Sequence, residues 1–140
     1  MSVLSDLYVS TPDKFLDYDE AQEAPEDERA ELTGFTSIEF STLWAILEGK
    51  EWEEAHMDAF EPEMEKDGGD RMIFLVPAKL VDLAASLDEA AIASAAEQWA
   101  ETDELEHCEA EDLVETIKEL QRVAKVAKET KRGLYLWNCV

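Results

Sequence analysis

The sequence predicts a single α+β domain over residues 1–140, in which a small sheet packs against four to five helices. Its 140 residues, 46% of them hydrophobic, suit one domain with a buried core. Three short segments rich in β-branched and aromatic residues, near 3–9, 72–76 and 134–139, have the composition of strands. Between these segments apolar residues recur at helical spacing, so helices are expected to separate the strands along the chain.

The N-terminal elements are predicted to be a strand, a short helix and an acidic loop. The segment "VLSDLYVS" predicts the first strand. In "STPDKFLDY", Ser10 or Thr11 is placed as an N-cap and Pro12 lies in the first helical turn. The acidic loop at about 17–33 contains "DYDEAQEAPEDERAEL", in which eight carboxylates accompany the single cation Arg29.

The clearest helix signals lie at 36–49. Thr36 and Glu39 have the spacing of a capping box, and Gly49 stands where a helix stop is expected. Residues 50–71 predict one or two helical turns followed by a polar loop, "EPEMEKDGGDR".

The second half of the chain predicts strand, helices and strand. "RMIFLVP" reads as a buried strand ended by Pro77, with a helix directly after it. Ser86 and Glu89 have the spacing of a second capping box, which predicts a further helix. The last helix is predicted over 109–132, with acids at its start, bases at its end and Gly133 as its stop.

The formal charge of −23 is unevenly distributed. Residues 1–117 hold 33 acids and 6 bases, whereas residues 118–140 hold 2 acids and 6 bases. Direct nucleic-acid binding is disfavoured, because that affinity rests on Lys and Arg neutralising phosphates. No apolar run approaches the ~18 residues of a membrane span, the start lacks a signal-peptide pattern, and two cysteines make no disulfide framework. We therefore expect a cytoplasmic protein that does not enter a membrane, while its oligomeric state stays open.

Patterns typical of catalytic or metal sites are weak. His56, His107, Cys108 and Cys139 lack the paired spacing of a zinc site, and "EPEMEKDGGD" lacks the register of a calcium loop. Acidic neighbours disfavour the thiolate of Cys108, and the common nucleophile and phosphate-binding motifs are missing. We expect no metal and no cofactor, and no pattern singles out a catalytic carboxylate among the 35 acids.

Two acidic segments, 17–31 and 101–115, predict a docking surface for a basic protein if they lie on the same side of the fold. Solvated faces, solubility and salt adaptation are the alternative explanations of this acidity. Under the docking interpretation the protein is a non-enzymatic, immunity-like or inhibitor-like factor. The residues expected to contact the partner are Asp17, Asp19, Glu20, Glu26, Asp27, Glu28, Glu104, Glu106, Glu109 and Glu111.

A second hypothesis is a small enzyme or ligand-binding domain with a pocket near Trp44, His56 and Trp99. Trp52 also stands out, because it lies amid charged residues in "GKEWEEAHM". An aromatic residue in that setting is either a binding hot spot or a lid over the core.

Three segments resemble the YfbM-like group of small bacterial proteins of unknown function. "SIEFSTLWAILEGKEW" resembles the group's Trp-bearing helix that ends in Gly, and "RMIFLVPAKLVDLAASLDEAAI" resembles its strand, Pro and paired helices. "DLVETIKELQRVAKVAKETKRGLYLW" resembles its closing helix and strand. The resemblance covers residues 36–137 loosely and implies a bacterial origin and an α+β fold. It leaves the acidic stretch outside and implies no activity.

Overall fold

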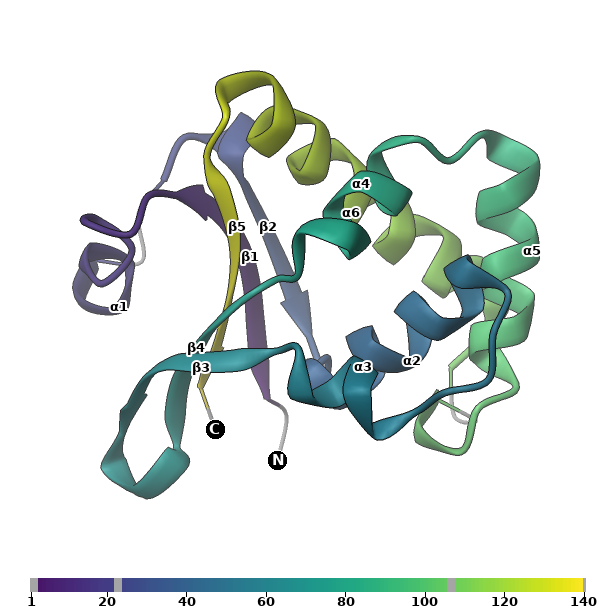
Figure 1. Ribbon diagram of the computed structural model, residues 1–140, viewed down its shortest axis with the longest axis horizontal. Helices are drawn as coiled ribbons and strands as arrows, with labels where there is room; N and C mark the ends of the chain where they lie inside the picture. Colours follow the sequence, from purple (N-terminus) through teal and green to yellow (C-terminus); the bar gives the residue numbers. More distant parts are fainter. Residues whose placement is uncertain (1–2, 22–23, 106–107, 140) are drawn as a thin grey trace.

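The computed structural model describes residues 3–21, 24–105 and 108–139 of the chain. At its centre is a five-stranded antiparallel sheet in the order β2-β1-β5-β4-β3 (Figure 1). The strands are β1 (Leu4–Ser10), β2 (Arg29–Thr33), β3 (Glu61–Lys66), β4 (Arg71–Leu75) and β5 (Gly133–Cys139). Together with the helices, this sheet confirms the predicted α+β class.

Helices α2, α4, α5 and α6 lie on one side of the sheet, and α1 lies on the other (Figure 1). The α-helices are α1 (Asp17–Ala21), α2 (Ser37–Glu48), α3 (Glu54–Asp58), α4 (Ala78–Ala85), α5 (Glu89–Ala100) and α6 (Ala110–Thr130). Three short 3₁₀ helices are η1 (Glu26–Glu28), η2 (Asp67–Gly69) and η3 (Asp103–Leu105). Within the described ranges, no helix has both the length and the apolar character needed to cross a membrane.

The larger core lies between the sheet and the helical layer. Side chains of a strand alternate between its two faces, so every second residue of the central strands β1 and β5 points into this core. Leu7 and its cross-strand partner Leu136 are fully buried there. Helix α6 meets them with Ile117 and Leu120, which are also fully buried. The apolar stripe of α6 seen in the sequence is therefore its core-facing side.

A smaller aromatic cluster covers the opposite face of the sheet. Tyr8, Tyr135 and Trp137 come from β1 and β5, and Tyr18 of α1 stacks on Tyr8 with ring centroids 4.1 Å apart. The Tyr18 hydroxyl donates to Asp6 Oδ2 at 2.5 Å. Burial raises the pKa of the Asp6 carboxyl above its ordinary value, although the Tyr18 hydrogen bond opposes the rise. The start of the acidic stretch is thus packed onto the sheet.

The helix termini follow local chemistry, although several of them differ from the prediction. The capping box of Thr36 and Glu39 is confirmed, and Gly49 ends α2 in the left-handed conformation at φ 70°. Helix α5 begins at a different cap from the predicted one. Asp88, rather than Ser86, is the N-cap, and its carboxylate accepts a backbone N–H of the first turn at 2.7 Å.

Gly133 has a different role from the predicted helix stop. Helix α6 ends at Thr130, and Lys131 takes the left-handed conformation with φ 55°. Gly133 begins β5, where a Cβ atom would lie 3.2 Å from the Tyr135 ring and 3.3 Å from Leu75 Cδ1. Close packing of the sheet, rather than helix termination, explains the glycine.

Two strands lie outside the sequence prediction, and the first helix begins later than predicted, at Asp17. Strand β3 occupies a segment predicted as a loop, and only Met64 in it is buried. Strand β2 lies inside the segment 17–33 that was predicted as an acidic loop. Both are edge strands, where exposed charged side chains conceal the alternation of a half-buried strand. The described chain has six α-helices rather than four to five, because α1 and α3 are five-residue helices.

Candidate functional site

The two acidic segments lie far apart. Segment 17–31 forms α1, η1 and most of β2, whereas segment 101–115 connects α5 to α6 and forms the start of α6. Figure 1 shows α1 and the α5–α6 connection toward opposite ends of the longest axis. The helical layer and the sheet lie between them, so the segments do not merge into one negative surface.

The predicted contact residues of the second segment lie at or before the start of α6. Glu109 and Glu111 are exposed there. Glu106 lies outside the described residues, and only the backbone of Glu104 is described. The carboxylates that the structure describes at this end flank the N-terminus of α6, where negative charge complements the helix dipole.

In the first segment, four of the six predicted contact residues are exposed. Asp17 and Glu20 lie on α1, and Glu26 and Asp27 lie on η1. The other two, described below, are engaged within the protein.

Asp19 is a buried structural residue rather than a contact residue. Its carboxylate accepts hydrogen bonds from Trp137 Nε1 at 3.0 Å, Lys66 Nζ at 2.9 Å and Arg71 Nη1 at 3.3 Å. Burial alone would raise the pKa of this carboxyl, but the Trp137 and Lys66 hydrogen bonds and the Arg71 charge outweigh it and hold the pKa below its ordinary value. Asp19 therefore fixes α1 to the sheet, and a partner cannot reach it.

Glu28 is half-buried and joined to Arg132. Two guanidinium nitrogens of Arg132 each lie 2.9 Å from a carboxylate oxygen of Glu28, which makes a two-pronged ion pair. The Arg132 hydrogen bond lowers the pKa of Glu28. This pair ties η1 to the residues just after α6, so Glu28 also has a structural role.

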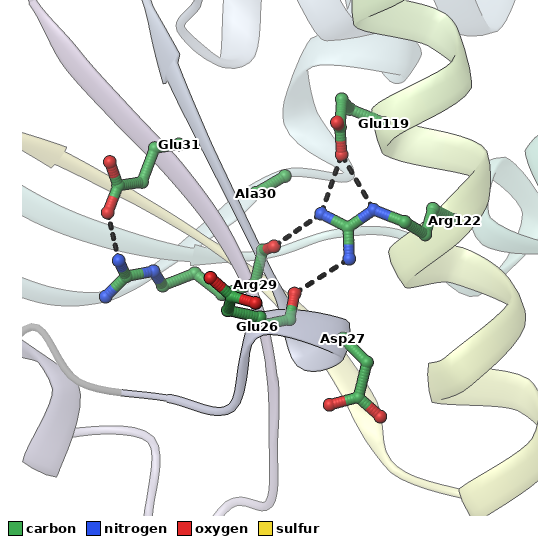
Figure 2. Close-up of a pocket in the computed structure, with 7 residues that line it drawn as sticks. All are labelled: Glu26, Asp27, Arg29, Ala30, Glu31, Glu119 and Arg122. Carbon is green, nitrogen blue, oxygen red and sulfur yellow. Dashed lines mark hydrogen bonds and ion pairs between the residues drawn. The ribbon is translucent and has the colours of Figure 1, made fainter.

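Between η1, β2 and α6 lies a hollow of about 590 Å³, which we call the acidic cleft (Figure 2). Its lining is mainly charged, with carboxylates outnumbering guanidiniums. The lining residues are Glu26, Asp27, Arg29, Ala30, Glu31, Glu119 and Arg122. Figure 2 shows the side chains of Glu26 and Asp27 turned away from Arg122. The cleft therefore presents carboxylates to solvent while Arg122 forms part of its wall.

Arg122 of α6 positions the acidic cleft. Its Nη1 donates to the carbonyl oxygen of Glu26 at 2.8 Å, and its Nη2 donates to the carbonyl oxygen of Arg29 at 2.6 Å. Its Nε donates to Glu119 Oε2 at 2.8 Å. The other guanidinium of the cleft, on Arg29, pairs with Glu31 (Figure 2). Both cations are used inside the protein, and the exposed carboxylates of Glu26 and Asp27 form no ion pair with either of them. Arg132, which is paired with Glu28, is close enough for the charge of Asp27 to act on it.

Replacing Arg122 with methionine is expected to lower the free energy of unfolding by about 1–2 kcal/mol, because the substitution keeps the aliphatic stem but removes three hydrogen bonds at a partly exposed site. Hydrogen exchange should accelerate at the amides of 26–31, since η1 loses its anchor. Lys125→Met on the exposed face of α6 is the control and should change stability by less than about 0.5 kcal/mol. Equal exchange rates at 26–31 in both variants would contradict this role of Arg122.

No protein-family model, no curated protein and no solved structure matches the chain. The resemblance of residues 36–137 to the YfbM-like group stays a prediction.

A second, smaller pocket of about 210 Å³ lies beside Trp44 and His56. The two rings meet edge-on with centroids 5.0 Å apart. His56 Nδ1 accepts the backbone N–H of Glu53 at 3.0 Å, and its Nε2 lies 2.8 Å from Glu48 Oε1. Both ring nitrogens are engaged, so the imidazole is badly placed to exchange a proton with a substrate. Trp99 does not line this pocket; it is fully buried, and its indole nitrogen donates to a backbone carbonyl of α2.

The remaining candidates for chemistry are two free cysteines. Burial and the nearby charge of Asp112 raise the pKa of the Cys108 thiol, which disfavours the nucleophilic thiolate. Cys139 packs beside the aromatic cluster at the end of β5. Over the ranges that the structure describes, no group of three or more His, Cys, Asp or Glu is placed to hold a metal ion.

The sequence predicted part of the acidic cleft and missed the rest. Glu26 and Asp27 stood out by charge density alone. Glu119 and Arg122 gave no signal, because an acid and a base three residues apart on a helix are common on solvated surfaces. Only the fold shows that Arg122 contacts a backbone more than 90 residues away in sequence.

Proposed function

We propose that this protein is a non-enzymatic, cytoplasmic interaction protein that binds a basic protein partner at the acidic cleft, in the manner of an immunity or inhibitor factor. The observation that carries the proposal is the balance of charge in the cleft. Its two guanidiniums are engaged by Glu31, Glu119 and backbone carbonyls. Within the described ranges, the carboxylates of Glu26 and Asp27 have no ion-pair partner, so a Lys or Arg of a partner would find them available.

The whole-molecule charge supports the same proposal. A net charge of −23 attracts a basic surface over distances of about a Debye length and raises the association rate. Single exposed ion pairs contribute only about 0–1 kcal/mol, so specificity has to come from a shaped site where several pairs form together. The cleft is such a site, because its wall is fixed by Arg122 and by the Glu28–Arg132 pair.

The test compares two double charge reversals with the same change in net charge. The probe is a labelled peptide of alternating Lys, Arg and Ser, titrated at low and at physiological salt. Glu26→Lys with Asp27→Lys should weaken binding by about tenfold, because two attractive contacts become repulsive. The control, Glu97→Lys with Glu101→Lys, changes exposed residues at the C-terminal end of α5 and should weaken binding less than about threefold.

Two results would overturn the proposal. Equal weakening by both double variants would show that only net charge matters, and the cleft would have no special role. Lack of binding to the wild-type protein at low ionic strength would remove the electrostatic basis altogether.

A small-ligand site beside Trp44 is the second candidate function. It is favoured by one observation: Trp44 Nε1 is buried and has no hydrogen-bond partner in the described part of the chain. Lys50 and Lys79 line the same pocket together with Glu48 and Glu53, so its charges balance. A small carboxylate would accept from the indole N–H and pair with one of the lysines. Against it, the volume of about 210 Å³ is below the roughly 300–1,000 Å³ of usual ligand pockets. Saturable binding of benzoate that is lost in Lys79→Met would favour this candidate.

A further inference from the structure

An apolar hollow of about 440 Å³ lies between the start of α2 and α3, away from the acidic cleft. It is lined by Ile38, Thr42, Trp52 and Met57. Ile38 and Trp52 are each 46% exposed, which is unusual for large apolar side chains that stand next to each other. An exposed Trp beside a second apolar side chain has the composition of a binding hot spot, where Trp is enriched.

The Trp52 ring is held in place. Its Nε1 donates to Ser41 Oγ at 2.9 Å, and the Ser41 hydroxyl in turn donates to the carbonyl oxygen of Ile38 at 2.7 Å. The indole is therefore tied to the first turns of α2, over the buried Ser41, with part of its surface open to solvent. A side chain that is already fixed loses little conformational entropy on binding, so the hollow is preorganised.

The chain around the hollow is acidic. Glu51, Glu54 and Asp58 are exposed and lie next to Trp52 and Met57 in sequence, whereas Glu53 lines the pocket beside Trp44. In the ranges that the structure describes, none of these three acids has an ion-pair partner. The hollow therefore has an uncharged, mainly apolar lining, and exposed acids are the chain neighbours of two of its lining residues.

We propose that this hollow docks a basic amphipathic segment of a partner protein, with one apolar side chain seated on Trp52 and Ile38 and flanking Lys or Arg residues facing the acids. Charge complementarity selects this occupant. A second copy of the chain would bring like charge against the first, because each molecule carries a net charge of −23. The proposal goes beyond the acidic cleft and uses different residues, so either site can fail without the other.

The fluorescence of Trp52 reports directly on binding at the hollow. Trp44, Trp99 and Trp137 are buried, so acrylamide should quench mainly the fluorescence of Trp52. The probe is a helical peptide with a single Leu or Phe anchor and Lys on both sides. Its binding should protect Trp52 from quenching, and the protection should weaken as salt is added.

The variants separate the hollow from general surface effects. Ile38→Gln should weaken peptide binding by about tenfold, since it removes one of the two large exposed apolar side chains of the hollow. Leu16→Gln is the matched control, because Leu16 is 49% exposed near α1 and the substitution also leaves the charge unchanged. It should bind the peptide as the wild type does. Circular dichroism of both variants checks that the fold is retained.

Three outcomes would overturn the proposal. The first is equal binding by Ile38→Gln and the wild type. The second is equal binding of a peptide whose anchor is Ser or whose lysines are Glu. The third is a dimer, detected by sedimentation, that Ile38→Gln dissolves, because the hollow would then belong to a second copy. Repeating the titration with the Glu26→Lys, Asp27→Lys protein keeps the two sites distinguishable, since the effect of the anchor residue should persist there.

Discussion

Replacing Trp99 with alanine is expected to lower the free energy of unfolding by about 3–5 kcal/mol, the largest loss among the substitutions considered. Trp99 is fully buried in α5 and packs against Phe35 and Phe40, with ring centroids 5.4 and 6.1 Å away. Its Nε1 donates to the carbonyl oxygen of Glu39 at 3.0 Å, which joins α5 to α2. Alanine would leave a cavity where these elements meet. Urea denaturation followed by circular dichroism measures the loss.

The matched control is Trp52→Phe. Trp52 is 46% exposed and makes one side-chain hydrogen bond, so its replacement should cost only about 0.5–1 kcal/mol. A cost for Trp99→Ala close to that of the control would contradict the central packing role of Trp99. The stability cost of Trp99→Phe should fall between those of the two variants, because an aromatic side chain still fills part of the space while the indole hydrogen bond is lost.

Replacing Asp19 with alanine is expected to cost about 3 kcal/mol at neutral pH, because it removes a buried carboxylate from two cations and an indole N–H. The cost lies at the lower end of the range for broken buried pairs, since the side chains of Lys66 and Arg71 are 43% and 33% exposed and regain water. The same denaturation experiment measures it. Asp17→Ala, on the exposed side of α1, should change stability by less than about 0.5 kcal/mol.

The stabilisation of the folded protein by Asp19 should decrease as the pH falls. Because the pKa of Asp19 is lower in the folded protein than in the unfolded chain, its stabilisation is complete above the unfolded pKa and is lost as the pH falls through the folded pKa. The difference between wild type and Asp19→Ala should therefore shrink in acid. Asp6, whose pKa is raised, acts in the opposite direction but is present in both proteins and largely cancels. A difference that stays constant from neutral to acid pH would contradict the ionised, paired state of Asp19.

Helices could be predicted where a local cap or an apolar stripe in the sequence coincides with a core-facing helix in the structure. The capping box of Thr36 and Glu39 and the stripe containing Ile117 and Leu120 correspond to α2 and α6 in the structure. Strands β2 and β3 escaped prediction because edge strands carry charge on their exposed positions. In "EPEMEK" only Met64 reports the buried face, and one residue cannot define a period.

The negative charge of segment 17–31 could be predicted from the sequence, but the role of each acidic residue in it could not. Asp17, Asp19 and Glu20 look alike in sequence, yet only Asp19 faces the sheet. Its partners lie 47 to 118 residues away, so no local pattern distinguishes it. Trp52 did give a signal, an aromatic residue among charges, and the structure places it 46% exposed against α2. Its role as a binding residue stays a proposal.

The acidic cleft is most directly tested by mapping where a basic ligand binds. The amide chemical shifts of the isotopically labelled protein would be followed by NMR during titration with the Lys, Arg and Ser peptide, which has no apolar anchor. We expect the largest shifts at 26–31 and 119–122, around the acidic cleft, and we expect them to decrease as salt is added. Shifts that are largest at 109–115, or that spread evenly over the surface, would contradict a shaped basic-partner site between η1, β2 and α6.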